Sequence, residues 1–128
     1  MRIEHIAFNV ENAVESAKWY AENLDMTIVR GSDESPYIHF LADGERRTVL
    51  EFYSNPAAIV PDYASMNPLI LHIAFLVDDI EATRAKMVAA GGTAVGDTTT
   101  NPNGDQLAIV RDPWGLSVQL VTRAEPLL

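Results

Sequence analysis

The segment His5-Ile6-Ala7-Phe8 occurs a second time as His72-Ile73-Ala74-Phe75, 67 residues further along the chain. Each copy lies within a run that has the pattern of a β-strand, over residues 3–10 and 69–77. A repeat with this period and only two copies does not fit a solenoid. The chain is therefore expected to contain two copies of one folding unit.

A helix is predicted after each of these strands, because each strand is followed by a capping pattern. Asn12 has Glu15 three residues later, and Asp78 has Glu81 at the same spacing. A short polar residue followed by glutamate at this distance is typical of a capping box. The helices are expected over residues 13–23 and 80–90, and Gly91-Gly92 supplies a left-handed stop for the second.

Three further strands are predicted after each helix. In the first half they cover residues 26–30, 37–42 and 47–53, and in the second half residues 93–97, 106–111 and 116–122. Asp43-Gly44 indicates a hairpin between two strands of the first half. Asp112-Pro113-Trp114-Gly115 indicates a turn with proline at its second position in the second half.

These patterns predict an α+β fold of two βαβββ modules, which form a curled mixed sheet around a cleft and carry their helices on the outer face. The modules cover about residues 3–53 and 69–122 of a single domain, 1–128. The segment between them, about 54–68, contains three of the seven prolines and is expected to be a linker.

Composition disfavours several kinds of protein. The 128 residues include 18 acidic and 9 basic side chains, and the formal net charge of −9 disfavours binding to nucleic acid or to an anionic membrane surface. There is no cysteine, which rules out disulfide scaffolds and thiolate metal sites. No apolar run is long enough to span a bilayer. The first residues lead straight into a strand and leave no room for a signal peptide, so we expect a cytoplasmic protein.

Polar residues recur on the strand faces opposite the large apolar ones. His5 and His72 occupy the same position of the repeat, and Glu51 near the end of the first module corresponds to Gln119 in the second. Strand alternation assigns all four to faces that line the expected cleft. Two imidazoles, one carboxylate and a weaker carboxamide suit one divalent ion such as Zn²⁺, Ni²⁺, Co²⁺, Mn²⁺ or Fe²⁺. The pattern therefore predicts a metal site at these four residues.

Other residues on the same faces are candidates for contact with a substrate. Tyr37, His39 and Tyr53 are predicted to do so, although the tyrosines could simply fill the cleft and His39 could lie on the surface. Glu51 also has a purely structural interpretation. It interrupts an apolar run, and a salt bridge with an arginine such as Arg47 would offset the cost of burying it.

Together these features resemble the vicinal oxygen chelate superfamily. Its members include glyoxalase I, methylmalonyl-CoA epimerase, extradiol dioxygenases, fosfomycin-resistance thiol transferases and bleomycin-resistance binding proteins. The resemblance covers about residues 3–122 and is carried by these segments: His5-Ile6-Ala7-Phe8, Trp19-Tyr20 to Leu24, Val49-Leu50-Glu51-Phe52, His72-Ile73-Ala74-Phe75, and Asp112-Pro113-Trp114-Gly115 leading to Val118-Gln119-Leu120. In the metal-using members the ligands lie in the first and last strands of each module, which implies His5, Glu51, His72 and Gln119 here.

The fourth ligand position departs from the resemblance. Metal-dependent members usually carry glutamate there, whereas Gln119 cannot take a proton and could instead hydrogen-bond across the cleft. Glu51 is then the only carboxylate of the set and the implied proton-moving base. The missing glutamate disfavours extradiol dioxygenase and fosfomycin transferase activity.

Two classes of function follow from the resemblance. The first is a divalent-metal-dependent lyase or isomerase of glyoxalase or epimerase type, in which Glu51 moves a proton of a small oxygen-chelating substrate. The second is a metal-free protein of bleomycin-resistance type that sequesters a small planar compound, and a dioxygenase of the same superfamily remains a further alternative. Strand edges and the apolar segments at residues 57–60 and 69–71 predict a twofold homodimer, as the resemblance also does.

Overall fold

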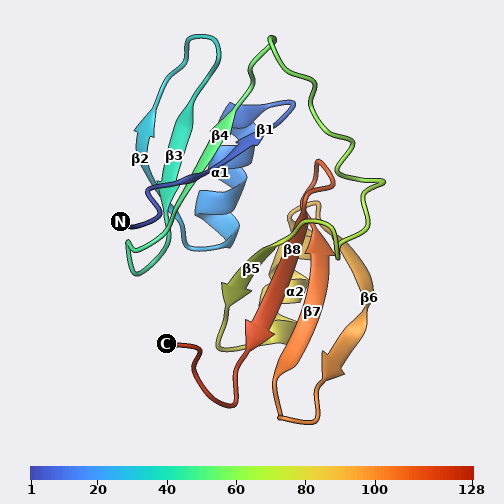
Figure 1. Ribbon diagram of the computed structural model, residues 1–128. Helices are drawn as coiled ribbons and strands as arrows, with labels where there is room; N and C mark the ends of the chain where they lie inside the picture. Colours follow the sequence, from blue (N-terminus) through green and yellow to red (C-terminus); the bar gives the residue numbers. More distant parts are fainter. The chain divides into compact units, whose positions relative to one another are not determined.

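The structure is a computed structural model that describes residues 1–128. It divides them into two compact units, Met1–Pro61 and Asp62–Leu128. Both units have the same order of elements, namely a strand, a helix and three further strands (Figure 1). The predicted α+β fold of two βαβββ modules is therefore confirmed.

The first unit is a four-stranded mixed sheet with one helix. Its strands lie in the order β1-β4-β3-β2, with β1 parallel to β4 and the other neighbours antiparallel. The helix covers the predicted residues, whereas most of the strands are shorter than predicted. The elements are β1 (Ile6–Asn9), α1 (Ala13–Asn23), β2 (Thr27–Gly31), β3 (His39–Ala42) and β4 (Val49–Tyr53).

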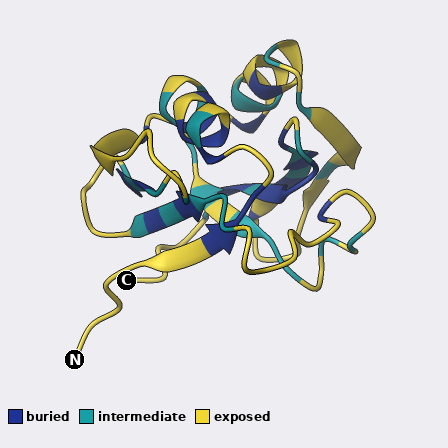
Figure 2. Ribbon diagram, turned by 90° about the horizontal axis from the view of Figure 1, so that it is seen from above, coloured by how far each residue is buried: buried dark blue, intermediate teal, exposed yellow.

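The helix α1 packs on one face of this sheet and forms the core with it. Tyr20 is fully buried, and its ring centroid lies 4.8 Å from that of Phe52 in β4. Phe8, Leu41 and Leu50 are buried on the same face of the sheet. Figure 2 shows buried residues on one side of the helices and exposed residues on the other. One face of the first sheet is therefore covered by α1 and the core, and polar side chains that could bind a ligand lie on the opposite face.

The second unit repeats this arrangement. Its strand order is β5-β8-β7-β6, again with the first and last strands of the unit parallel. Ile80 and Met87 of the helix are buried, as are Val118 and Leu120 of the sheet. The elements are β5 (Ile73–Leu76), α2 (Ile80–Ala89), β6 (Thr93–Thr100), β7 (Gln106–Arg111) and β8 (Ser117–Thr122).

The helix caps agree with the sequence in one unit and differ in the other. Asn12 caps α1 as predicted, and its side chain accepts a hydrogen bond of 3.1 Å from the backbone N–H of Glu15. The predicted box of Asp78 with Glu81 is wrong, because Asp79 is the cap and its carboxylate accepts from the Ala82 N–H at 2.9 Å. The shift by one residue follows from the helix starting at the buried Ile80, which leaves Asp79 in the extended cap position.

The hairpin between β3 and β4 is confirmed, but its connection is longer than the two-residue turn that Asp43-Gly44 indicated. The loop closes between Asp43 and Thr48, whose backbone groups are bonded at 3.0 Å. The Asp43 carboxylate accepts from the backbone N–H of Arg47 at 2.8 Å, and Arg46 rather than Gly44 takes the left-handed conformation. The Asp43 side chain thus closes a loop longer than two residues by accepting hydrogen bonds from backbone N–H groups of that loop.

No helix of either unit has the length and apolar character needed to cross a membrane.

Candidate metal-binding residues

The histidine and the glutamate predicted in the first unit lie side by side. His5 Nε2 is 3.1 Å from Glu51 Oε2. Glu51 lies at the centre of β4 and is paired with Ala7 of β1, so alternation along β1 brings His5 to the same face. The Glu51 side chain is only 12% exposed, against 37% for His5. The predicted common face of these two residues is confirmed.

The structural interpretation of Glu51 as a partner of Arg47 is wrong. Arg47 lies in the loop before β4, and its Nε is 3.3 Å from the carboxylate of Glu45. Both side chains of that pair are largely exposed. The carboxylate of Glu51 therefore faces an imidazole and not a guanidinium.

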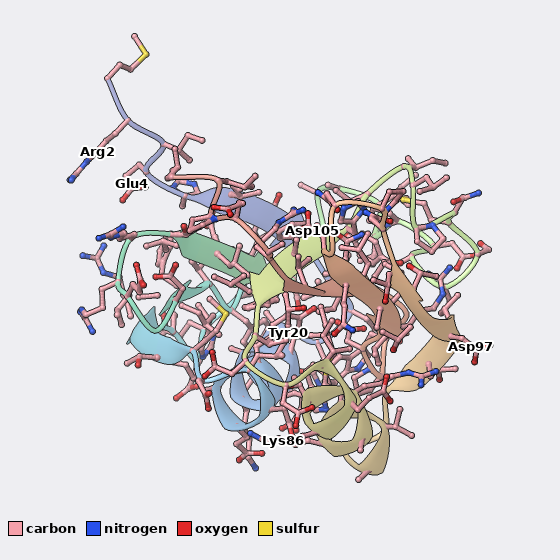
Figure 3. The ribbon with its side chains drawn as sticks, turned by 90° about the horizontal axis from the view of Figure 1, so that it is seen from below. Arg2, Glu4, Tyr20, Lys86, Asp97 and Asp105 are labelled. Atoms are coloured by element: carbon pink, nitrogen blue, oxygen red, sulfur yellow. The ribbon has the colours of Figure 1, made fainter.

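His5 is held on its other side by a second carboxylate. Its Nδ1 contacts the carboxylate of Glu4, on the segment that leads into β1 (Figure 3). The hydrogen bond to Glu4 is the largest influence and raises the pKa of His5, with further Coulombic support from Glu4 and Glu51 and opposition from desolvation. A carboxylate on one ring nitrogen is the usual support for a histidine that binds metal through the other. His5 Nε2 and the Glu51 carboxylate are therefore adjacent candidate ligands for a metal ion.

The second unit carries a comparable pair. His72 Nδ1 is 2.8 Å from the backbone carbonyl of Pro68. A carbonyl only accepts, so Nδ1 carries a proton and donates it, which points Nε2 away from this bond. Gln119 of β8 is paired with Ala74 of β5, two residues after His72, so alternation places both on one face.

The candidate metal ligands lie in two pairs, one in each unit. The structure has no group of three or more histidine, aspartate or glutamate side chains placed to hold an ion. His5 and Glu51 form one pair in the first unit, and His72 and Gln119 share a face in the second. Imidazole, carboxylate and amide oxygen are ligand types that suit a divalent ion such as Zn²⁺, Ni²⁺, Co²⁺, Mn²⁺ or Fe²⁺. That both pairs bind the same ion stays a prediction.

The prediction that His39 shares the face of Glu51 is wrong. The register of β3 on β4 pairs Phe40 with Glu51, and it pairs His39 with Phe52 on the core face. His39 is 7% exposed, its Nδ1 bonds the Tyr37 carbonyl at 2.9 Å, and it is therefore a core residue. The apolar Phe40 takes the face of Glu51 in its place, because strand register and not hydrophobicity decides the face.

The two predicted tyrosines lie in different settings. Tyr53 is at the end of β4, two residues after Glu51, and alternation places it on the same face. Tyr37 lies before β3 in the left-handed conformation, follows Pro36, and is 39% exposed. Their contact with a substrate stays a prediction.

The structure also adds two residues that the sequence did not single out. Phe40 lies against His5, with ring centroids 5.6 Å apart in an edge-on geometry. Arg30 of β2 is paired with Phe40, and its Cζ is 5.9 Å from the centre of that ring. A basic residue and an aromatic ring therefore extend the face of His5 and Glu51 toward β2.

The repeat, the mixed sheets and the paired donors define a class of protein. The sequence model of the Glyoxalase/Bleomycin resistance protein/Dioxygenase superfamily matches residues 2–120, and the chain belongs to this superfamily.

Among curated proteins, the lactoylglutathione lyase of Haemophilus influenzae is 30% identical over 127 residues, which cover 94% of this chain and 92% of that protein. A probable lactoylglutathione lyase of Vibrio cholerae is 31% identical over 126 residues, which cover 94% of this chain and 89% of that protein. Among solved structures, a glyoxalase family protein of Bacillus cereus has a TM-score of 0.80 at 15% identity, covering 95% of this chain and 93% of that one.

Proposed function

We propose that this chain is a divalent-metal-dependent lyase of glyoxalase type, which interconverts the adduct of a 2-oxoaldehyde and a thiol with the corresponding 2-hydroxy thioester. The proposal depends above all on one observation, the 3.1 Å approach of His5 Nε2 to Glu51 Oε2 with Nδ1 of the same ring held by Glu4. The relatives named lactoylglutathione lyase support the same chemistry, with glutathione as the thiol.

Two pairs of residues are proposed as the ligands. His5 and Glu51 contribute one imidazole and the only carboxylate, and His72 and Gln119 contribute a second imidazole and a neutral amide oxygen. Two neutral imidazoles and one carboxylate leave a net positive charge on a divalent ion. Such an ion supplies Lewis acidity, which stabilises negative charge on the oxygens of the substrate.

Glu51 is proposed as the group that moves the proton. The reaction shifts a hydrogen between neighbouring carbons, so one residue has to accept a proton from carbon and return it to the next carbon. Gln119 cannot accept a proton, whereas the Glu51 carboxylate can. Tyr53, at the end of the same strand, is proposed to contact the substrate from this face, and Tyr37 remains a candidate for a second contact.

The assay is turnover of methylglyoxal with glutathione by protein stripped of metal and then reloaded with Zn²⁺, Ni²⁺, Co²⁺, Mn²⁺ or Fe²⁺. We expect the thioester to form only with a metal added, and His5→Ala and His72→Ala to lose this activity. Absence of turnover with all five ions would contradict the proposal and favour a binding protein of the same superfamily.

We also propose that the chain forms a twofold homodimer. Several large apolar side chains of the second unit are exposed, including Leu69 at 87%, Ile70 at 73% and Leu76 at 75%. Exposed apolar side chains of this kind are typical of surfaces that bind another chain. Light scattering should give twice the chain mass of 14.1 kDa, and a value of 14.1 kDa at micromolar concentration would reject the dimer.

A further inference from the structure

An irregularity in β2 decides where the side chain of Arg30 lies. Ile28 is paired with Leu41, and Arg30 is paired with Phe40, so Val29 is an extra residue in β2. In a regular strand, Val29 would be paired with Phe40 and Arg30 would share the core face of Ile28. The bulge transfers Arg30 to the face of Glu51, and bulges at sheet edges commonly redirect a side chain in this way.

Phe40 connects this arginine to the proposed ligands. Its ring lies 5.6 Å from the His5 ring and 5.9 Å from the Arg30 guanidinium, and Phe40 is also the register partner of Glu51. A guanidinium close to an aromatic ring is stabilised by the ring quadrupole and keeps its N–H groups for another partner. On this face of the sheet, Phe40 therefore lies between Arg30 on one side and Glu51 on the other.

Arg30 has no carboxylate of the protein to neutralise it. None of the ion pairs in the structure includes Arg30, and Glu51 is paired with His5 instead. Four other arginines are engaged: Arg47 with Glu45, Arg84 with Glu81, Arg123 with Asp105, and Arg111 with backbone carbonyls. Arg2 and Arg46 also form no ion pair, but neither lies in a strand of the sheet that carries Glu51. In a chain of net charge −9, an exposed guanidinium without an ion pair, on the sheet face that carries Glu51, can attract an anion.

We infer that Arg30 binds a carboxylate of the substrate and thereby determines specificity for anionic thiol adducts. The planar fork of N–H groups suits a carboxylate, which can accept two of them. Phe40 packs against the carbon chain between that carboxylate and the reacting carbonyl. This inference rests on the proposed function, because it assigns the ligand of Arg30 to the same substrate that His5 and Glu51 bind.

The test compares two compounds that differ in one group. The acetonyl thioether of 3-mercaptopropionate and that of 3-mercaptopropanamide share the carbonyl and the sulfur, and only the first carries a carboxylate. Their binding to the metal-loaded protein is measured by calorimetry. We expect the carboxylate to bind about 10-fold or more tightly than the amide, as charge-assisted hydrogen bonds do compared with neutral ones.

Three variants assign this difference to one side chain. Arg30→Gln should weaken the carboxylate compound to the affinity of the amide, and Arg30→Lys should keep part of the difference because it retains the charge without the fork. Arg47→Gln is the matched control, since Arg47 lies in the same unit and is already paired with Glu45, and it should keep the whole difference. The inference would be overturned if the wild type bound the two compounds equally or bound neither. It would also be overturned if Arg30→Gln bound the carboxylate compound as tightly as the wild type does.

Failure of this inference is distinguishable from failure of the proposed function. If the lyase function fails, the methylglyoxal–glutathione adduct is not converted, yet the binding difference and its loss in Arg30→Gln remain. If the inference on Arg30 fails, that adduct is still converted and the binding difference is absent.

Discussion

His5 lies between the carboxylates of Glu4 and Glu51, for which we propose different roles. The Glu4 carboxylate contacts Nδ1 and so fixes the orientation of the ring. The Glu51 carboxylate lies next to Nε2, where both are proposed to bind the same ion. His72 is oriented by a backbone carbonyl instead. The two imidazoles are therefore positioned by different means but present the same nitrogen.

Replacement of Glu51 by glutamine tests its role at the scale of a single residue. Glu51→Gln keeps the size of the side chain but removes the only carboxylate of the proposed ligand set, so no group accepts the proton. We expect the reaction rate with metal at saturation to fall by about 10²–10⁴-fold, as is usual when a general base is lost. The measurement is incorporation of solvent deuterium into a bound 2-hydroxy carbonyl compound.

Two further variants control for this change. Glu45→Gln removes a carboxylate that is paired with Arg47 in an exposed loop, and it should leave the exchange rate unchanged. Gln119→Glu adds a carboxylate at the corresponding position of the second unit, and it should tighten metal binding and keep or increase the exchange. If Glu51→Gln exchanges as fast as the wild type, Glu51 is not the base.

At the scale of the strands, sequence patterns predicted which elements form but did not always predict which face a residue takes. The alternation in β1, β4 and β8 is regular, so His5, Glu51 and Gln119 could be assigned correctly to their faces. The bulge at Val29 and the register of β3 on β4 depend on long-range pairing, for which a single sequence carries no signal. For this reason Arg30 was missed.

The turn between β7 and β8 gives a prediction at the element scale. Gly115 has φ +95°, and a Cβ there would lie 2.6 Å from the backbone of Ala64. We expect Gly115→Ala to lower the free energy of unfolding by about 3 kcal/mol, from backbone strain combined with overpacking. Urea denaturation measures the change.

The control for this prediction separates strain from crowding. Gly96 in β6 also has a positive φ, of +67°, but no atom lies within 4 Å of the position of its Cβ. Gly96→Ala should therefore cost only about 1 kcal/mol, from the backbone conformation alone. Equal losses in the two variants would show that the contact with Ala64 does not matter.

At the scale of the whole molecule, the repeat predicted most of the fold. Two copies of one tetrapeptide, each before a capped helix, led to two βαβββ modules, and the structure has the same elements in the same order. No helix or strand lies between Tyr53 and Ile73, and the role of residues 54–68 as a linker stays a prediction. The ends of β7 are as predicted, at residues 106 and 111, whereas the other strands begin or end at different residues, since pairing with neighbouring strands determines where a strand stops.

Asp105, in the loop before β7, is a carboxylate whose contacts with residues 123 and 124 contribute to the response of the fold to acid. The backbone N–H of Ala124 and the side chain of Arg123 hold the pKa of Asp105 below its usual value, with smaller help from Asn103 and opposition from desolvation (Figure 3 labels Asp105). A lowered pKa in the folded state contributes stability above the unfolded pKa of about 3.9, and this contribution is lost as the pH falls through the folded value.

Asp105→Asn should therefore be less stable than the wild type by a constant margin between pH 5 and pH 8, and the margin should shrink below about pH 4. Denaturant unfolding at a series of pH values measures it. Asp97→Asn is the control, since Asp97 is exposed in β6 and forms no ion pair. A margin that stays the same down to pH 2 would contradict the assigned role of Asp105.

Titration of the metal-free chain with Ni²⁺ tests whether His5 with Glu51 and His72 with Gln119 are ligands of one divalent ion. Calorimetry gives the stoichiometry and affinity for the wild type, His5→Ala, Glu51→Gln, His72→Ala and the control Glu45→Gln. We expect one ion per chain, an affinity at least about 10-fold weaker in each of the three ligand variants, and no change in the control. Binding of Ni²⁺ with the same affinity to His5→Ala and His72→Ala as to the wild type would contradict this expectation.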